Sequence, residues 1–114
     1  MKNDIKTFVN GILSLDVNRD FIFIKGADLK YLYANSNYCS LFNITLNDIF
    51  GKRDNYFIKD LKALKNCEKS DKIALENNQI ICAEKMFGKE FSILKIKINL
   101  NQTDKGILCL AKMK

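Results

Sequence analysis

Residues 31–51, with the sequence YLYANSNYCSLFNITLNDIFG, constrain the fold most, because they predict a strand that runs directly into two short helices. The stretch opens with aromatic and bulky residues that suit a pleated strand. Asn35 is a favourable N-cap for the first helix, since its side-chain oxygen can accept a hydrogen bond from a first-turn amide. Thr45 and Asp48 have the spacing that caps a second helix, and Gly51 can close it in the left-handed conformation. A strand joined to two short helices rich in aromatic residues predicts one wall of a small pocket.

The size and composition of the chain predict one domain with a substantial core, because 47% of its 114 residues are hydrophobic. The formal net charge of +6 is spread along the sequence, without the run of like charges that a basic arm needs. Nucleic-acid binding through the basic C-terminal strands is therefore only a third hypothesis, and we predict no nucleic-acid partner. The C-terminal lysines are interpreted as solvated strand faces and turns, namely Lys85, Lys89, Lys95, Lys97 and Lys105.

Four well-separated cysteines lie within apolar patterns and are interpreted as free, buried thiols: Cys39, Cys67, Cys82 and Cys109. The sequence shows no secretory signal, no apolar run long enough to span a bilayer and no lipidation motif. These features predict a cytoplasmic protein that does not insert into a membrane.

Two segments are predicted, a flanking helix at residues 1–18 and a domain at residues 19–114. The flanking helix is amphipathic, with an apolar stripe at helical spacing formed by Ile5, Phe8, Val9, Ile12 and Leu13. The run FIFI at residues 21–24 predicts a buried strand. A turn at residues 26–28 then connects it to the strand that begins at Tyr31, which gives a first hairpin.

A long helix and three strands complete the prediction. Asp60 can cap a helix that runs to Glu76, with core-facing residues expected at Leu61, Leu64, Cys67, Ala74 and Leu75. Residues 79–86, 90–100 and 107–113 predict consecutive antiparallel strands. The chain order therefore predicts an α+β fold, a five-stranded antiparallel sheet with central helices on one face. The outer face of the last strand is apolar and needs a cover, for which the flanking helix and a second copy are the candidates.

The order of these elements and their residues resemble a PAS domain of the bacterial sensory type, from about Phe21 to Met113. The matching segments are FIFIKGADLKYLYAN, NSNYCSLFNI, TLNDIFGKRD and the closing ILCLA. The resemblance implies a signal-transduction sensor that holds a small ligand or cofactor between the central helices and the sheet. It also implies signalling through the sheet, flanking helix and dimer interface to an output domain. Such outputs include a histidine kinase of a two-component system, a diguanylate cyclase, a chemotaxis transducer or a transcription regulator.

No such output machinery is present in these residues, so we expect a covalently linked or separate output domain. Because the closing strand ends almost at Lys114, where a linker would begin, a segment cut from a longer protein is the favoured interpretation.

The residue types that are absent restrict the chemistry. Without histidine, the chain lacks the common axial ligand of haem, the usual general base and the usual zinc ligand. The segment GKRDNYFIKD has no cysteine, although the resemblance places the reactive cysteine of light-sensing members there, which argues against a covalent flavin adduct. A non-covalent flavin or a small organic ligand stays open. The sequence contains no Cys-x-x-Cys pair of the kind that binds metals, and no Ser, Thr or Cys has a candidate base beside it in the sequence. We therefore predict neither a metal site nor catalysis.

Aromatic and aliphatic residues with a few polar ones predict a small-molecule pocket, lined by Tyr38, Phe42, Leu46, Phe50, Asn55, Tyr56, Phe57, Leu61, Ile73, Glu84, Ile96 and Cys109. Ser70 and Lys95 are further polar candidates. Glu84 is the most informative, because an inward carboxylate in an apolar strand needs a partner, whereas an outward one could pair with Lys95 or Lys97.

The alternative hypothesis is that these side chains fill the core completely. The chain would then be a protein-interaction and dimerisation module without a ligand. In either case we predict a homodimer that uses the flanking helix and the outer sheet face through Ile5, Phe8, Ile12, Phe91, Ile93, Leu108 and Leu110.

Overall fold

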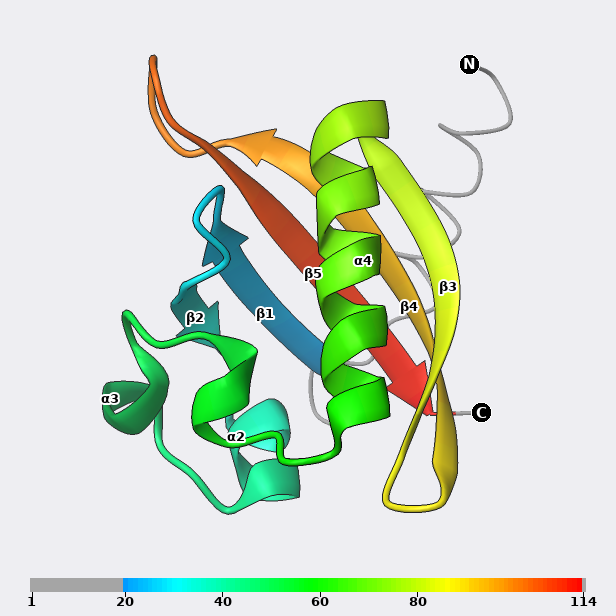
Figure 1. Cartoon of the computed structure of the whole chain (residues 1–114). Helices are drawn as coiled ribbons and strands as arrows, with labels where there is room; N and C mark the ends of the chain where they lie inside the picture. The colour runs from blue at the N-terminus through cyan, green and yellow to red at the C-terminus, as the bar shows by residue number, and fades with distance from the viewer. Residues whose placement is uncertain (1–19, 114) are drawn as a thin grey trace.

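The computed structural model describes residues 20–113, which form five strands, three α-helices and one 3-10 helix (Figure 1). In chain order they are β1 (Phe21–Gly26), β2 (Tyr31–Ala34), α2 (Ser36–Phe42), α3 (Leu46–Ile49), η1 (Asp54–Tyr56), α4 (Leu61–Asn77), β3 (Gln79–Met86), β4 (Lys89–Asn99) and β5 (Lys105–Met113). The predicted flanking helix, with Ile5, Phe8 and Ile12, lies outside the described residues.

All five strands form one antiparallel sheet in the order β2-β1-β5-β4-β3. The last strand, β5, pairs with both β1 and β4, and so joins the first hairpin to the C-terminal strands. Figure 1 shows α4 crossing one face of the sheet, with α2, α3 and η1 grouped nearer to β1 and β2. The predicted α+β architecture with a five-stranded antiparallel sheet is confirmed.

The helices begin at the capping residues that the sequence indicates. The Asn35 side chain accepts a hydrogen bond from the backbone amide of Tyr38, 3.1 Å away, and starts α2. Thr45 and Asp48 form a reciprocal capping box at the start of α3. Asp60 accepts hydrogen bonds from two first-turn amides of α4. Each cap satisfies amides that would otherwise lack partners, and together they fix where the chain leaves β2 and enters each helix.

The helix α4 presents a narrow buried stripe to the sheet, formed by Ala63, Cys67, Ser70, Asp71 and Ala74. It ends at Asn77, one residue beyond the predicted end at Glu76, and the next residue, Asn78, has a left-handed backbone with φ of 76°. Leu61, predicted to face the core, is instead 77% exposed. Because each residue turns an α-helix by about 100°, a position two residues before Ala63 points away from the buried stripe.

The register of β4 and β5 corrects part of the predicted outer face. Opposed residues in an antiparallel pair share a face, and Ile93 is opposite Ala111. Phe91 and Ile93 are each 2% exposed and belong, with Ala111, to the core on the helix side of the sheet. Their placement on the outer face was therefore wrong. Leu108 and Leu110 alternate with core residues of β5 and lie on the opposite face, as predicted.

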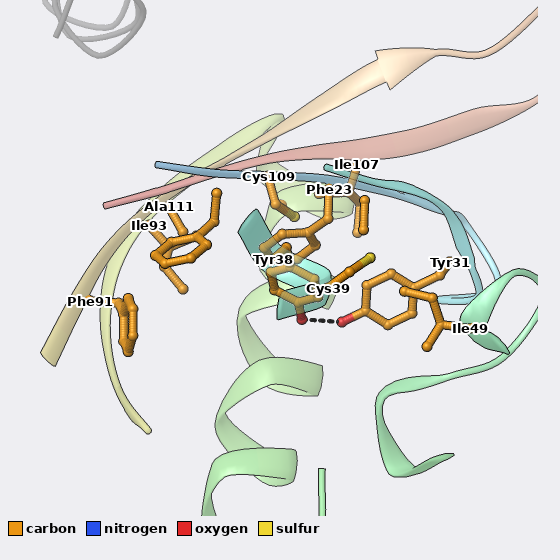
Figure 2. Close-up of a cluster of buried hydrophobic side chains, with 13 residues drawn as sticks. Phe23, Tyr31, Tyr38, Cys39, Ile49, Phe91, Ile93, Ile107, Cys109 and Ala111 are labelled. Carbon is orange, nitrogen blue, oxygen red and sulfur yellow. Dashed lines mark hydrogen bonds between the residues drawn. The ribbon is translucent and has the colours of Figure 1, made fainter. Parts of the chain in front are cut away.

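An aromatic cluster fills the core at the end of the sheet that carries α2 and η1. Figure 2 shows Phe23, Tyr31 and Tyr38 next to one another, and the rings of Phe23 and Tyr38 are 4.3 Å apart between centroids. Phe42 and Phe57 continue the cluster with an edge contact at 4.8 Å. Tilted and edge contacts are the favourable geometries of aromatic rings, so this cluster holds β1, β2, α2 and η1 together.

Candidate functional site

Two lysines of the sheet point inward towards α4 and share one carboxylate. Lys25 in β1 and Lys95 in β4 are each 1% exposed, and Asp71 of α4 is fully buried. The Nζ atoms of Lys25 and Lys95 lie 2.7 Å from Oδ2 and Oδ1 of Asp71, respectively. Because β5 separates β1 from β4 in the sheet, this carboxylate links two strands that do not pair with each other and ties both to the helix.

Asp54, at the start of η1, extends the network towards the surface. Its Oδ2 accepts a hydrogen bond from Lys25 Nζ at 2.7 Å, and its Oδ1 accepts one from the Tyr31 hydroxyl at 2.5 Å. The Tyr31 and Tyr38 hydroxyls are in turn 2.5 Å apart (Figure 2). The Asp54 side chain is 12% exposed, so this carboxylate connects the buried charges to the edge of the aromatic cluster and to solvent.

Glu84 of β3 lies at the other end of the network. Lys95 Nζ donates to Ser70 Oγ at 2.7 Å and lies 3.5 Å from Glu84 Oε1. Glu84 also accepts hydrogen bonds from Ser70 Oγ at 3.3 Å and from Cys67 Sγ at 3.2 Å. Of the two predicted orientations, Glu84 therefore takes the inward one with a partner. The interpretation of Lys95 as a solvated lysine was wrong. Its side chain lies on the same side of the sheet as that of Glu84, the side that faces the helices.

The buried charges compensate one another. Burial alone would lower the pKa of Lys25, but the carboxylates of Asp54 and Asp71 outweigh it and raise the pKa above its ordinary value. Burial likewise opposes the charge of Lys95, and Asp71 leads the groups that raise its pKa overall. Every buried side-chain nitrogen and oxygen in the described part of the chain has a hydrogen-bond partner. Both lysines are therefore ammonium ions at neutral pH and serve as donors rather than nucleophiles.

The tyrosines and thiols next to the network are held in their neutral forms. Burial, followed by the neighbouring Tyr38 and Asp54, raises the pKa of Tyr31 well above its usual range. Burial raises the pKa of Cys109 to about 12, and burial and Glu84 raise the pKa of Cys67. A nucleophilic cysteine needs a lowered pKa, so these two thiols have the character of packing groups and hydrogen-bond donors.

The predicted pocket residues separate into three groups. Tyr38 and Cys109 are buried, and Phe42, Leu46 and Phe57 pack against the core; all five fill the interior. Glu84 belongs to the ionic network, and Ile73 borders a groove beside β3. The remaining predicted residues do not line the interior, namely Phe50, Asn55, Tyr56, Leu61 and Ile96.

Each of these corrections has a local reason. Phe50 is 59% exposed because the preceding Ile49 takes the buried position at the end of α3. Tyr56 is 51% exposed and stacks under the Lys52 ammonium group on the surface. Ile96 is opposite Leu108 and so faces away from the helices. Asn55 is exposed and lines a surface cavity.

Sequence reasoning missed Lys25, Asp54 and Asp71 as site residues, although a signal for two of them was present. Lys25 follows Phe21 and Phe23 in the same alternation phase, and both phenylalanines are buried. Asp71 lies four residues after Cys67 in α4, on the same buried stripe. Strand and helix periodicity therefore point both charges inward. Asp54 carries no comparable pattern, because it begins a single 3-10 turn.

The apolar interior between α2 and the sheet contains little free space. An apolar cavity bordered by Phe21, Tyr38, Phe91 and neighbouring side chains has a volume of about 10 Å³, close to the minimum for one water molecule. A larger cavity of about 260 Å³ opens at the surface between the β1–β2 turn, η1 and α4. Among residues 20–113, no helix is long and apolar enough to cross a membrane, and no three potential metal ligands cluster together.

Comparison with known proteins identifies the fold. No protein-family model and no curated protein matches the chain. A domain of an HTR-like protein from Haloarcula marismortui has a TM-score of 0.73 at 14% identity, covering 82% of this chain and 96% of that one. The PAS domain of Bordetella pertussis BvgS has a TM-score of 0.68 at 15% identity, covering 96% and 86%. The PAS domain of the histidine kinase ThkA has a TM-score of 0.65 at 18% identity, covering 82% and 98%. The chain has the PAS fold.

Proposed function

We propose that this chain is a PAS-type signal-relay domain that works through its surfaces, because its own charged side chains fill its interior. The observation that carries the proposal is the ionic network of Lys25, Asp54, Asp71, Glu84 and Lys95 between α4 and the sheet. The PAS domain of the histidine kinase ThkA has the same fold, which supports a role in signal transduction. The filled-core interaction module is thus favoured over a sensor with a ligand in its core.

A ligand in the core would have to displace charges that depend on one another. Removing one partner of a buried ion pair costs about 3–5 kcal/mol, and Asp71 is a partner of two lysines. A non-covalent flavin does not fit these residues, since its ring system would occupy the space that Lys25, Lys95 and Asp71 fill. Haem is not supported either, because the chain has no histidine. The proposal assigns no catalytic activity to this chain.

The outer face of the sheet is the proposed route of the signal. Leu94 and Ile96 of β4 are opposite Leu110 and Leu108 of β5, so the four apolar side chains form a continuous patch. An antiparallel sheet with an apolar outer face needs a cover. We propose that residues 1–18, through Ile5, Phe8 and Ile12, and a second copy of the chain supply it, and that an output domain such as a histidine kinase receives the change in a cytoplasmic setting.

Native mass spectrometry of freshly purified protein tests the filled interior. We expect the mass of the polypeptide, or twice that mass, without an adduct. A reproducible adduct that survives desalting, and that a crystal structure places between α4 and the sheet, would overturn the proposal in favour of a core ligand.

Sedimentation equilibrium tests the outer face as a dimer interface. The wild type is expected to dimerise, and Leu108→Asp is expected to be monomeric, because a carboxylate cannot be buried unpaired in the apolar patch. Thr103→Asp, in the exposed turn before β5, is the matched control and is expected to dimerise normally. A wild type that stays monomeric at high concentration would contradict the dimer.

A further inference from the structure

The cavity of about 260 Å³ at the surface combines both signs of charge with two apolar side chains. It is lined by Leu29, Arg53, Asp54, Asn55, Leu64 and Glu68. These residues come from three separate segments, the β1–β2 turn, the start of η1 and α4. The cavity is smaller than the sites that hold drug-sized molecules, so a matching ligand has few non-hydrogen atoms.

The charged groups of the cavity differ in how they are paired within the described part of the chain. The guanidinium of Arg53 is exposed and has no ion-pair or hydrogen-bond partner among residues 20–113. Glu68 is more than half exposed and contacts Lys72 on the solvent side at 3.1 Å. The Asp54 carboxylate is 12% exposed and is already bound to Lys25 and Tyr31. One free cation thus lies in the same cavity as two carboxylates, one of which belongs to the buried network.

The apolar wall of the cavity is held in an uncommon backbone conformation. Leu29 has a φ of 67°, a backbone conformation that residues other than glycine, asparagine and aspartate rarely adopt. Its amide donates to the carbonyl of Gly26 at 2.9 Å, and the next amide, of Lys30, donates to Asp28 Oδ1 at 3.1 Å. These bonds fix the turn and place the Leu29 side chain against the core and beside the cavity.

We propose that this cavity binds a small aliphatic zwitterion, an α-amino acid or a close analogue. The ligand carboxylate would pair with the Arg53 guanidinium, the ligand ammonium group with Asp54 and Glu68, and the aliphatic part would contact Leu29 and Leu64. A dianion would meet two carboxylates and a dication would meet the guanidinium, so a zwitterion matches the charges best. The filled interior does not depend on this site.

Binding at this cavity has a direct route into the ionic network. A ligand ammonium group would compete with Lys25 for Asp54, and Lys25 shares Asp71 with Lys95. A ligand shifts a conformational equilibrium only through different contacts in the two states. The exchange of Lys25 for a ligand as the partner of Asp54 supplies such a difference, and it would change how β1, β4 and α4 are held together.

Backbone amide NMR of the full chain tests this proposal with L-leucine and L-alanine as probes. Saturable shifts are expected for at least one of them at residues 29, 53–55, 64 and 68. The matched controls are 3-methylbutylamine and 4-methylpentanoate, which keep the leucine side chain but lack the carboxylate or the amine. Each is expected to bind at least about tenfold more weakly than L-leucine, because each lacks one charge-assisted interaction. No shift with either amino acid at about 10 mM, or equal binding of either control, would overturn the proposal.

Variants in the cavity wall separate binding at this site from binding elsewhere. Arg53→Gln and Glu68→Gln are expected to weaken binding of the amino acid by about tenfold each, whereas Lys52→Gln, next in sequence but outside the cavity, is expected to bind normally. Unchanged affinity in both cavity variants would refute this site. A thermal melt checks that these variants fold. Native mass spectrometry and sedimentation test the proposed relay function separately, and both variants are expected to give the wild-type result in them.

Discussion

The helix side of the sheet contains two regions that are stabilised in different ways. The aromatic region, formed by Phe23, Tyr38, Phe42 and Phe57 with their neighbours, gains free energy from apolar area removed from water and from ring contacts. The ionic region, formed by Lys25, Asp54, Asp71, Glu84 and Lys95, contains charges whose burial is unfavourable unless each keeps its partner. The aromatic region therefore tolerates small changes one at a time, whereas the ionic region depends on all its members.

This difference bears on the signal-relay function proposed above. The aromatic region ties α2 and η1 to β1 and β2 through many weak contacts. The ionic region joins β1, β4, η1 and α4 through a few strong ones. A change of one partner in the ionic region affects several elements at once, which the proposed relay between the surface cavity and the sheet requires.

The largest expected effect is that of Asp71→Ala. The substitution leaves the ammonium groups of Lys25 and Lys95 without their shared buried partner, and we expect the free energy of unfolding to fall by about 3–5 kcal/mol. Urea denaturation measures it. Glu68→Ala, on the exposed side of the same helix, is the control and is expected to stay within about 0.5 kcal/mol of the wild type. A loss for Asp71→Ala as small as the control's would contradict the difference between the two regions.

The next effect is a loss of stability at alkaline pH. The folded state raises the pKa values of Cys67, Cys109, Tyr31, Lys25 and Lys95, so it binds these protons more tightly than the unfolded chain. Their contribution is complete below the unfolded pKa values and declines as pH rises above them, starting near pH 8.5 for the thiols.

Urea titrations at several pH values measure this decline. With about 1.4 kcal/mol per pH unit for each group, the loss between pH 8 and pH 10 is expected to be on the order of 3 kcal/mol from the two buried thiols. Cys67→Ala and Cys109→Ala are each expected to reduce the dependence on pH. Stability that rises over this range would show that the assigned directions are wrong.

A smaller effect is expected in the apolar part of the core. Ile93→Val removes one methylene from a side chain that is 2% exposed, and we expect a loss of about 0.5–1.5 kcal/mol. The same urea assay measures it. A combination with a second conservative change, Leu75→Ile, is expected to be close to additive if the two side chains act as independent sites. A loss of stability as large as that of Asp71→Ala would contradict the difference between the apolar core and the ionic region.

The smallest effect is expected for the exposed ion pair of α4. Glu68 and Lys72 are 3.1 Å apart, with more than half of each side chain in solvent. Such pairs contribute about 0.3–0.5 kcal/mol, so Lys72→Met is expected to change the free energy of unfolding by no more than that. A clearly larger loss would mean that exposure does not separate the two kinds of ion pair in this protein.

Much of the fold follows from the sequence because local signals agree with one another. The caps at Asn35, Thr45 and Asp60 and the left-handed end of α4 at Asn78 are properties of short segments. Alternation and turns predict the strands, and their chain order predicts the single sheet. These features need no knowledge of distant residues.

The site was harder to predict because its residues meet only in three dimensions. Lysines in strands usually face water, so the sequence alone favoured an outward Lys95. Its inward orientation depends on Asp71 and Glu84, which lie beside it only in the folded structure. The exposed position of Phe50 reflects competition with Ile49 for one buried place. Which of two neighbouring apolar residues is buried depends on the path of the chain, which composition does not reveal.

The central claim is that Lys25 and Lys95 are buried, paired ammonium ions that fill the interior between α4 and the sheet. Nitrogen-15 NMR of lysine side chains tests it most directly, through the exchange of ammonium protons with water and the titration of each group between pH 7 and pH 12. We predict two lysine signals that are protected from exchange, titrate well above the ordinary value of about 10.4, and lose this protection in Asp71→Ala. Lysine signals that all exchange at the solvent-exposed rate and titrate near the ordinary value would contradict the claim.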